Sequence, residues 1–330
     1  MNLPRLLAST ALCLLSTLAQ AAGLAFIDVP ADQNGPALRG TVWTPCEAPA
    51  GPIVLEPLVL RGVRDCPIAG TQLPLIIVSH GTGGSSLGHH DTAAALADAG
   101  FVVAAINHPG DNFRDLSRQG HLSAFGTRPV DMKRLLDHLL GAWPGRSSLD
   151  AGRVGIFGFS RGGYTALATI GAVPDFTTRE DLCPPATTLP LCGEIKRRNM
   201  PPAPQRDARI RAAVVVDPLS FFSAEGLSGV TVPVQLWASA HGGDGVTPES
   251  VTALRRHLPT PPDWHVAANA GHFAFLAPCT PAMTQALPEL CRDRPGFERA
   301  DFHALFNGEV VAFFKQTLAS GRGEVASKKQ

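Results

Sequence analysis

Short, continuous apolar runs recur along the chain and alternate with longer segments in which apolar residues follow a helical period. A continuous apolar run is typical of a strand that is buried on both faces of a parallel sheet. Strands are predicted at residues 23–29, 38–43, 73–78, 101–106, 154–157, 212–216, 232–238 and 264–267, and helices at residues 92–99, 129–140, 162–170, 249–258 and 302–318. This alternation predicts an α/β fold with a mostly parallel central sheet flanked by helices. Functional residues are then expected at the carboxyl ends of the strands.

Two segments interrupt the alternation, at about residues 173–209 and 277–297, and we interpret both as insertions. A length of 330 residues suits a single large domain, which we place at residues 22–320. Residues 321–330 are predicted to form a flexible tail.

The N-terminus has the pattern of a secretory signal peptide at residues 1–21. Arg5 supplies the positive charge, residues 6–18 are apolar, and Ala19-Gln20-Ala21 is a small-x-small cleavage site. The mature chain is therefore expected to begin near Ala22 in the periplasm or outside the cell. The apolar stretch is too short to span a membrane, so no membrane span is expected.

Seven cysteines are present, and Cys13 lies within the predicted signal peptide. The other six form three local pairs, each around a proline-containing loop, and an oxidising compartment would allow them to close. Proximity favours the disulfides Cys46–Cys66, Cys183–Cys192 and Cys279–Cys291. The last two would close the two insertions.

The charges are balanced, with 28 basic and 28 acidic side chains and a net charge of zero. Nucleic-acid partners require a basic surface, so none is expected.

The motif Gly158-x-Ser160-x-Gly162 stands between a predicted strand and a predicted helix. A sharp strand-to-helix turn requires glycine on both sides of its tip, and it holds the tip residue in a strained conformation with its side chain exposed to a ligand. This is the nucleophile elbow of the α/β-hydrolases, and it predicts Ser160 as a catalytic nucleophile.

A serine hydroxyl requires a general base, and the base requires an acid to orient it. The order along the chain in this fold is serine, acid, histidine, with the histidine in a loop after the last strand. His272 meets that description. Asp217 ends one predicted strand and Asp244 follows the next, so either could be the acid.

An oxyanion hole requires two backbone N–H donors. The N–H groups expected to form it are those of Arg161, which follows the nucleophile, and of Thr82, in the glycine-rich loop after a buried strand. His89, His90 and Asp91 are adjacent in sequence, but adjacent residues on a helix point in different directions. No metal site is therefore expected there.

Four segments resemble a known family: residues 73–84, 99–110 and 158–163, and Gly271-His272-Phe273. They are similar to the predicted dienelactone-hydrolase-like bacterial esterases and to the platelet-activating factor acetylhydrolases. The resemblance implies a Ser-Asp-His triad, no cofactor, and a small-molecule carboxylic ester with a modest acyl group as substrate. It places the acid at Asp217 by analogy with the acetylhydrolases and at Asp244 by analogy with most other hydrolases. Dienelactone hydrolase itself has a cysteine nucleophile where this chain has Ser160.

These observations predict a secreted serine esterase. One alternative is a peptidase or acyltransferase with the same triad. The other is a binding protein that has the fold but no catalytic activity, because a fold alone does not establish a function.

Overall fold

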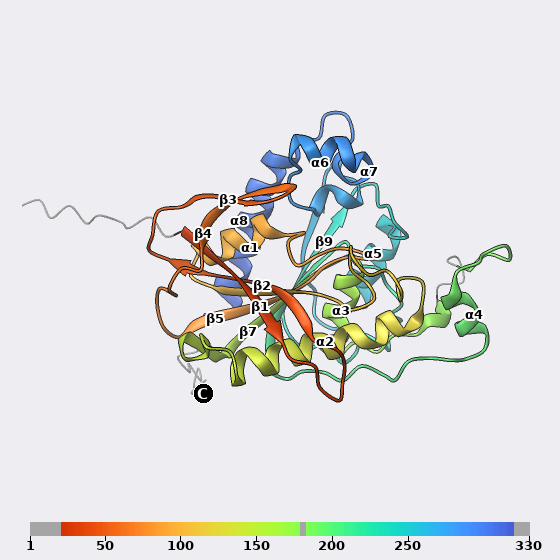
Figure 1. Ribbon diagram of the computed structural model, residues 1–330. Coiled ribbons are helices and arrows are strands. Elements are labelled where there is room, and N and C mark those ends of the chain that lie inside the picture. Colours follow the sequence, from red (N-terminus) through yellow and green to blue (C-terminus); the bar gives the residue numbers. More distant parts are fainter. Residues whose placement is uncertain (1–20, 179–182, 320–330) are drawn as a thin grey trace, which may run out of the picture.

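A computed structural model describes residues 21–178 and 183–319 (Figure 1). Its centre is one ten-stranded sheet with the order β10-β9-β8-β7-β5-β6-β2-β1-β4-β3. The strands are β1 (Ala21–Val29), β2 (Leu38–Cys46), β3 (Gly51–Leu55), β4 (Leu58–Arg64), β5 (Leu73–Ser79), β6 (Val102–Asn107), β7 (Leu149–Phe159), β8 (Ile210–Val216), β9 (Val234–Ser239) and β10 (Asp263–Ala267). The six strands from β6 to β10 in this order pair in parallel, whereas β2 is antiparallel to both β1 and β6. The predicted mostly parallel α/β sheet is confirmed.

Helices cover both faces of the sheet (Figure 1). The longer ones are α1 (His90–Asp98), α2 (Leu122–Gly141), α3 (Arg161–Thr169), α5 (Pro248–His257) and α8 (Arg299–Thr317). Along β5, Leu75 and Ile77 pack on the side of α2, α3 and α5, while Ile76 and Val78 pack on the side of α1 and α8. Successive strand residues point to opposite faces, so a strand covered on both faces is apolar throughout.

Helix α2 begins at Leu122, seven residues before its predicted start at Pro129. The Leu122 N–H donates to Oε2 of Glu194 (2.7 Å), and His121 Nδ1 bonds the other carboxylate oxygen (2.8 Å). A carboxylate at a helix N-terminus stabilises the first turn. Because Glu194 lies in the first insertion, 72 residues away, the local sequence around Pro129 does not reveal this cap.

The Cys46–Cys66 loop contains a hairpin of β3 and β4, although no strand was predicted there. Side chains in the hairpin alternate between buried and exposed: Ile53 and Leu60 are buried, while Val54 and Val59 are exposed.

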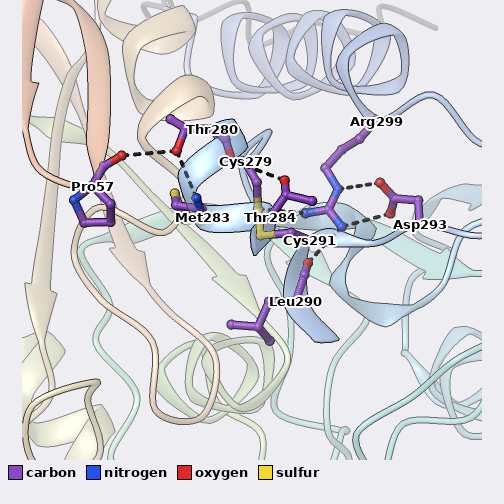
Figure 2. The surroundings of a disulfide bond; sticks show 9 residues. All are labelled: Pro57, Cys279, Thr280, Met283, Thr284, Leu290, Cys291, Asp293 and Arg299. Carbon is purple, nitrogen blue, oxygen red and sulfur yellow. Dashed lines mark hydrogen bonds and ion pairs between the residues drawn. A yellow bond between two sulfur atoms is a disulfide. The ribbon is translucent and has the colours of Figure 1, made fainter. Parts of the chain in front are cut away.

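The three disulfides pair as proximity predicted, Cys46–Cys66, Cys183–Cys192 and Cys279–Cys291. The first insertion carries α4 (Pro190–Lys196), whose Leu191 N–H bonds the carbonyl of Gly120 just before α2. The second carries α6 (Pro281–Ala286) and α7 (Pro288–Cys291), and Thr280 reaches the carbonyl of Pro57 in the hairpin (Figure 2).

The predicted signal peptide lies outside the described residues except for Ala21, and the predicted tail at 321–330 also lies outside them. Within the described ranges, no helix combines the length and apolar character that crossing a bilayer requires.

Candidate active site

Ser160 is the single residue between the end of β7 and the start of α3. Its φ of 57° and ψ of −119° are strained for a residue with a side chain. The two flanking glycines are sterically required: a Cβ on Gly158 would lie 2.1 Å from the carbonyl oxygen of Gly162, and one on Gly162 would lie 1.9 Å from that of Ser79. The backbone of the tip is also held, because the Ser160 N–H donates to Val216 O (2.9 Å) and the Leu219 N–H donates to Ser160 O (3.0 Å).

His272 follows β10 and meets Asp217, the residue after β8. The Nδ1–Oδ2 distance is 2.6 Å, and both side chains are buried. A carboxylate only accepts hydrogen bonds, so Nδ1 carries the proton and Nε2 of the neutral ring is left as an acceptor. Nε2 is buried and has no hydrogen-bond partner in the described part of the chain. The imidazole also stacks on Phe159, the neighbour of Ser160, with 4.7 Å between ring centroids.

The Asp217 carboxylate is held by Ser239 at the end of β9. The Ser239 N–H donates to Oδ1 (2.9 Å), and the Ser239 hydroxyl donates to Oδ2 (2.8 Å). The same hydroxyl accepts the Gly242 N–H (3.0 Å), and the carbonyl of Gly242 accepts the His272 N–H (2.9 Å). One chain of hydrogen bonds thus fixes the aspartate and the histidine relative to each other.

The structure brings Asp217, and not Asp244, to the imidazole. Asp244 is exposed, in a turn that is closed by hydrogen bonds between Gly243 and Val246. This turn contributes to the site through the backbone of Gly242.

The two predicted oxyanion donors belong to segments that adjoin Ser160. Arg161 is the first residue of α3, where an N–H has no acceptor within the helix and faces outward at the positive end of the helix dipole. Thr82 lies in the loop after β5, and the preceding Gly81 packs against the nucleophile: a Cβ on Gly81 would lie 3.3 Å from Ser160 Cβ.

Comparisons with known proteins place this geometry in a wider context. A family model described as serine aminopeptidase, S33, matches residues 71–215, a stretch that includes Ser160 but neither Asp217 nor His272. Among 838 matching chains of solved structures is a ferulic acid esterase from Streptomyces cinnamoneus. It aligns with a TM-score of 0.63 at 20% identity, over 96% of this chain and 95% of that chain. The fold is that of the α/β-hydrolases. A search of curated proteins gave no significant match.

Two residues beside this α/β-hydrolase site were not identified from the sequence. Arg128 of α2 is fully buried and contacts the loop of Thr82, and Asp111, after β6, contacts both Arg128 and Arg161. No signal in the sequence pointed to Arg128, because the predicted helix began at Pro129 and left Arg128 outside it, whereas α2 begins at Leu122.

His80 begins the loop that carries Thr82. Its Nδ1 donates to the carbonyl of Gly81 (2.7 Å), and its Nε2 accepts the His108 N–H (3.2 Å). Burial lowers the pKa of His80 to about 3, so the ring is neutral at physiological pH and holds the loop as a hydrogen-bonding group.

His89 and Asp91, which belong to the adjacent residues considered as metal ligands, contact different neighbours. The ring of His89 packs against Phe157 and Phe159, and burial lowers its pKa to about 4. Asp91 instead bonds His303 (2.6 Å) and Asn307 (2.8 Å). Within residues 21–178 and 183–319, no group of three or more His, Cys, Asp or Glu side chains is arranged to hold a metal ion.

Proposed function

We propose that the protein is a serine hydrolase that cleaves carboxylic esters of small molecules through an acyl-enzyme. The observation that carries the proposal is the buried Asp217–His272 hydrogen bond, which leaves an unpartnered Nε2 next to the strained Ser160 turn. A base with a fixed tautomer beside a serine hydroxyl is the arrangement that serine acyl transfer requires.

In the proposed reaction, Ser160 Oγ attacks the ester carbonyl and His272 Nε2 takes its proton. Asp217 keeps the proton on Nδ1 and stabilises the imidazolium. The N–H groups of Thr82 and Arg161 bind the oxyanion. His272 then protonates the departing alcohol, and a water molecule, deprotonated by the same imidazole, releases the acid and regenerates Ser160.

A peptidase with the same triad is the second candidate, because the matching family model is described as serine aminopeptidase. An aminopeptidase must bind the α-ammonium group of its substrate. Beneath the loop that carries Thr82, two guanidinium groups, those of Arg128 and Arg161, bond the carboxylate of Asp111. A guanidinium group repels an ammonium group at short range, so these two arginines disfavour an α-ammonium group beside this loop and favour an ester substrate.

Three disulfides support a place for the enzyme in an oxidising compartment, as does the signal-peptide pattern at residues 1–21. We propose that it works in the periplasm or outside the cell, without a cofactor.

The test is hydrolysis of p-nitrophenyl acetate, butyrate and octanoate and of methyl ferulate, the last chosen because of the structural neighbour, with aminoacyl p-nitroanilides as peptidase substrates. Wild type should cleave esters faster than anilides, and a fluorophosphonate should label it. Ser160→Ala should lose turnover by about 10⁶-fold and lose labelling, while Ser228→Ala, at an exposed serine, should behave as wild type. Faster anilide cleavage would favour the peptidase, and a protein that is neither active nor labelled would be a binding protein.

A further inference from the structure

A buried arginine lies directly beneath the loop that carries Thr82. All three guanidinium nitrogens of Arg128 donate hydrogen bonds: Nη1 to His80 O (2.6 Å), Nη2 to Gly81 O (3.0 Å) and Nε to Asp111 Oδ2 (2.9 Å). The residue is fully buried. It reaches residues 80 and 81 from α2, 48 and 47 positions away in sequence.

The carbonyl of Gly81 is fixed by three donors. They are Arg128 Nη2, His80 Nδ1 (2.7 Å) and the Gly84 N–H (3.2 Å). In a trans peptide the C=O of one residue and the N–H of the next point in opposite directions. The Thr82 N–H therefore points away from the guanidinium, and no backbone carbonyl of the described residues accepts it.

Asp111 joins this loop to the other side of the site. Its Oδ1 accepts the Gly83 N–H (3.1 Å), and its Oδ2 accepts both Arg128 Nε (2.9 Å) and Arg161 Nη1 (2.8 Å). The Arg161 guanidinium is held further by Gln119 O (2.9 Å) and lies over the Phe125 ring, 4.6 Å from its centroid. One carboxylate thus connects the loop that carries Thr82 to the side chain of Arg161.

We propose that Arg128 and Asp111 are positioning residues for the oxyanion hole: Arg128 orients the Gly81–Thr82 peptide, and Asp111 ties that peptide to Arg161 across Ser160. This inference rests on the proposed ester hydrolysis. Neither side chain touches the substrate in this scheme; both act through backbone groups.

Stability alone does not account for the cluster. Buried ion pairs are often no more stabilising than apolar side chains of the same size. Here the guanidinium groups of Arg128 and Arg161 are both buried and both bond Oδ2 of Asp111. Burial lowers the pKa of Arg128 only to about 10, so it stays charged at neutral pH. Fixed donors and positive charge beneath a developing oxyanion need no rearrangement during the reaction, which is the condition for electrostatic catalysis.

The experiment compares Arg128→Lys with Arg299→Lys. Arg299 is the matched control because it is also buried, pairs with an aspartate and donates to a backbone carbonyl, but does so around the Cys279–Cys291 disulfide (Figure 2). Lysine keeps the charge but cannot bond both His80 and Gly81 as the planar guanidinium does. Arg128→Lys should lower kcat for p-nitrophenyl butyrate by about 10- to 100-fold, which is less than the about 10²- to 10³-fold cost of removing one oxyanion donor, because the Thr82 N–H is displaced and not removed. KM should change by less than about threefold. Arg299→Lys should leave kcat within about twofold.

A transition-state analogue separates positioning from a purely structural role. The affinity of an alkylboronic acid, whose adduct with Ser160 carries a negative charge on oxygen, should fall in Arg128→Lys by the same factor as kcat/KM. An active wild type with an Arg128→Lys variant equal to Arg299→Lys in kcat and boronate affinity would overturn the positioning role alone. A wild type that is inactive on every ester and unlabelled at Ser160 would overturn the proposed function and this inference with it.

Asp111→Asn repeats the test if Arg128→Lys does not fold. It keeps an oxygen for the Gly83 N–H but loses the charge that binds the two arginines. It should lower kcat and boronate affinity together by about 10-fold, and unchanged values for both would contradict the proposal.

Discussion

Two buried arginine–aspartate pairs differ in how far away in sequence their hydrogen-bond partners lie. Arg299, the first residue of α8, bonds both oxygens of Asp293 (2.9 Å each) and the carbonyl of Leu290, all within nine positions in sequence, beside the second insertion that Cys279–Cys291 closes (Figure 2). Arg128 bonds two segments, at residues 80–81 and at Asp111, that are 17 to 48 positions away. The same chemistry therefore closes a local loop in one region and aligns distant loops in the other.

The two regions should also be destabilised by different conditions. The second insertion is closed by a covalent bond that a reductant breaks. The catalytic edge, which we define as the carboxyl ends of β5 to β10 with the loops that follow them, contains buried neutral histidines. The pKa values of His80, His89 and His108 are all lowered by burial, so acid destabilises this region. The catalytic edge should control rate and respond to pH, while the second insertion should control stability and respond to reduction.

The largest expected effect is that of Asp217→Asn at the catalytic edge. The Ser239 N–H keeps the amide oxygen at the position of Oδ1, so the amide nitrogen faces His272 Nδ1 and donates to it. The proton then moves to Nε2, which can no longer act as a base, and kcat should fall by about 10⁴-fold. The readout is kcat for p-nitrophenyl butyrate with the melting temperature measured in parallel. The matched control is Asp293→Asn, which removes an equally paired carboxylate from the second insertion and should leave kcat within about twofold. A loss below about 10-fold for Asp217→Asn would remove Asp217 from the mechanism.

Much of the fold and part of the candidate site could be predicted from the sequence because the signals are local. Apolar runs predicted the parallel strands, and cysteine spacing predicted all three disulfides. The Gly158–Ser160–Gly162 turn could be predicted because the glycines that it sterically requires lie within five adjacent residues. The position of His272 followed from the order of elements.

What the sequence could not decide depends on contacts between distant segments. Asp217 and Asp244 both follow strands, and only the path of the Gly242 loop shows that one carboxylate turns inward and the other outward. The start of α2 depends on Glu194, 72 residues away. The direction of Arg128 depends in turn on that start, so its contact with the Thr82 loop could not be predicted.

The next effect is the loss of the second insertion's disulfide. Replacing Cys279 and Cys291 with alanine opens a loop of 12 positions, and closing such a loop stabilises a protein by about 3 kcal/mol. Urea unfolding should report this loss, while kcat at 25 °C stays within about twofold of wild type, as it should after mild reduction of the wild type. A variant that is equally stable but more than about 10-fold slower would show that this region acts on the catalytic edge.

A smaller effect is expected from His89→Leu, and its sign depends on pH. The folded pKa of His89 is lowered to about 4 from an unfolded value of 6.5, mainly because the ring is buried. Its contribution to stability is therefore fully present above pH 6.5 and is lost as the pH falls toward 4. The free energy of unfolding of the variant, taken relative to that of wild type, should be about 2 kcal/mol higher at pH 5 than at pH 8. Urea unfolding at the two pH values measures this, and an equal difference at both would mean that His89 does not titrate on unfolding.

The smallest effect is expected from Asp244→Asn, in the loop that positions His272. Asp244 is exposed and has a φ of 49°, a conformation that asparagine adopts readily, so kcat and stability should stay near wild-type values. Gly242→Ala, two residues earlier, is the matched variant. Gly242 has a φ of +63°, its carbonyl accepts the His272 N–H, and a Cβ there would lie 2.4 Å from the carbonyl oxygen of Val246. This variant should displace His272 and lower kcat by about 10-fold or more. If Asp244→Asn lost as much activity as Asp217→Asn, the loop would have to bring Asp244 inward when substrate binds, and the catalytic edge would include a carboxylate that is exposed in the free protein.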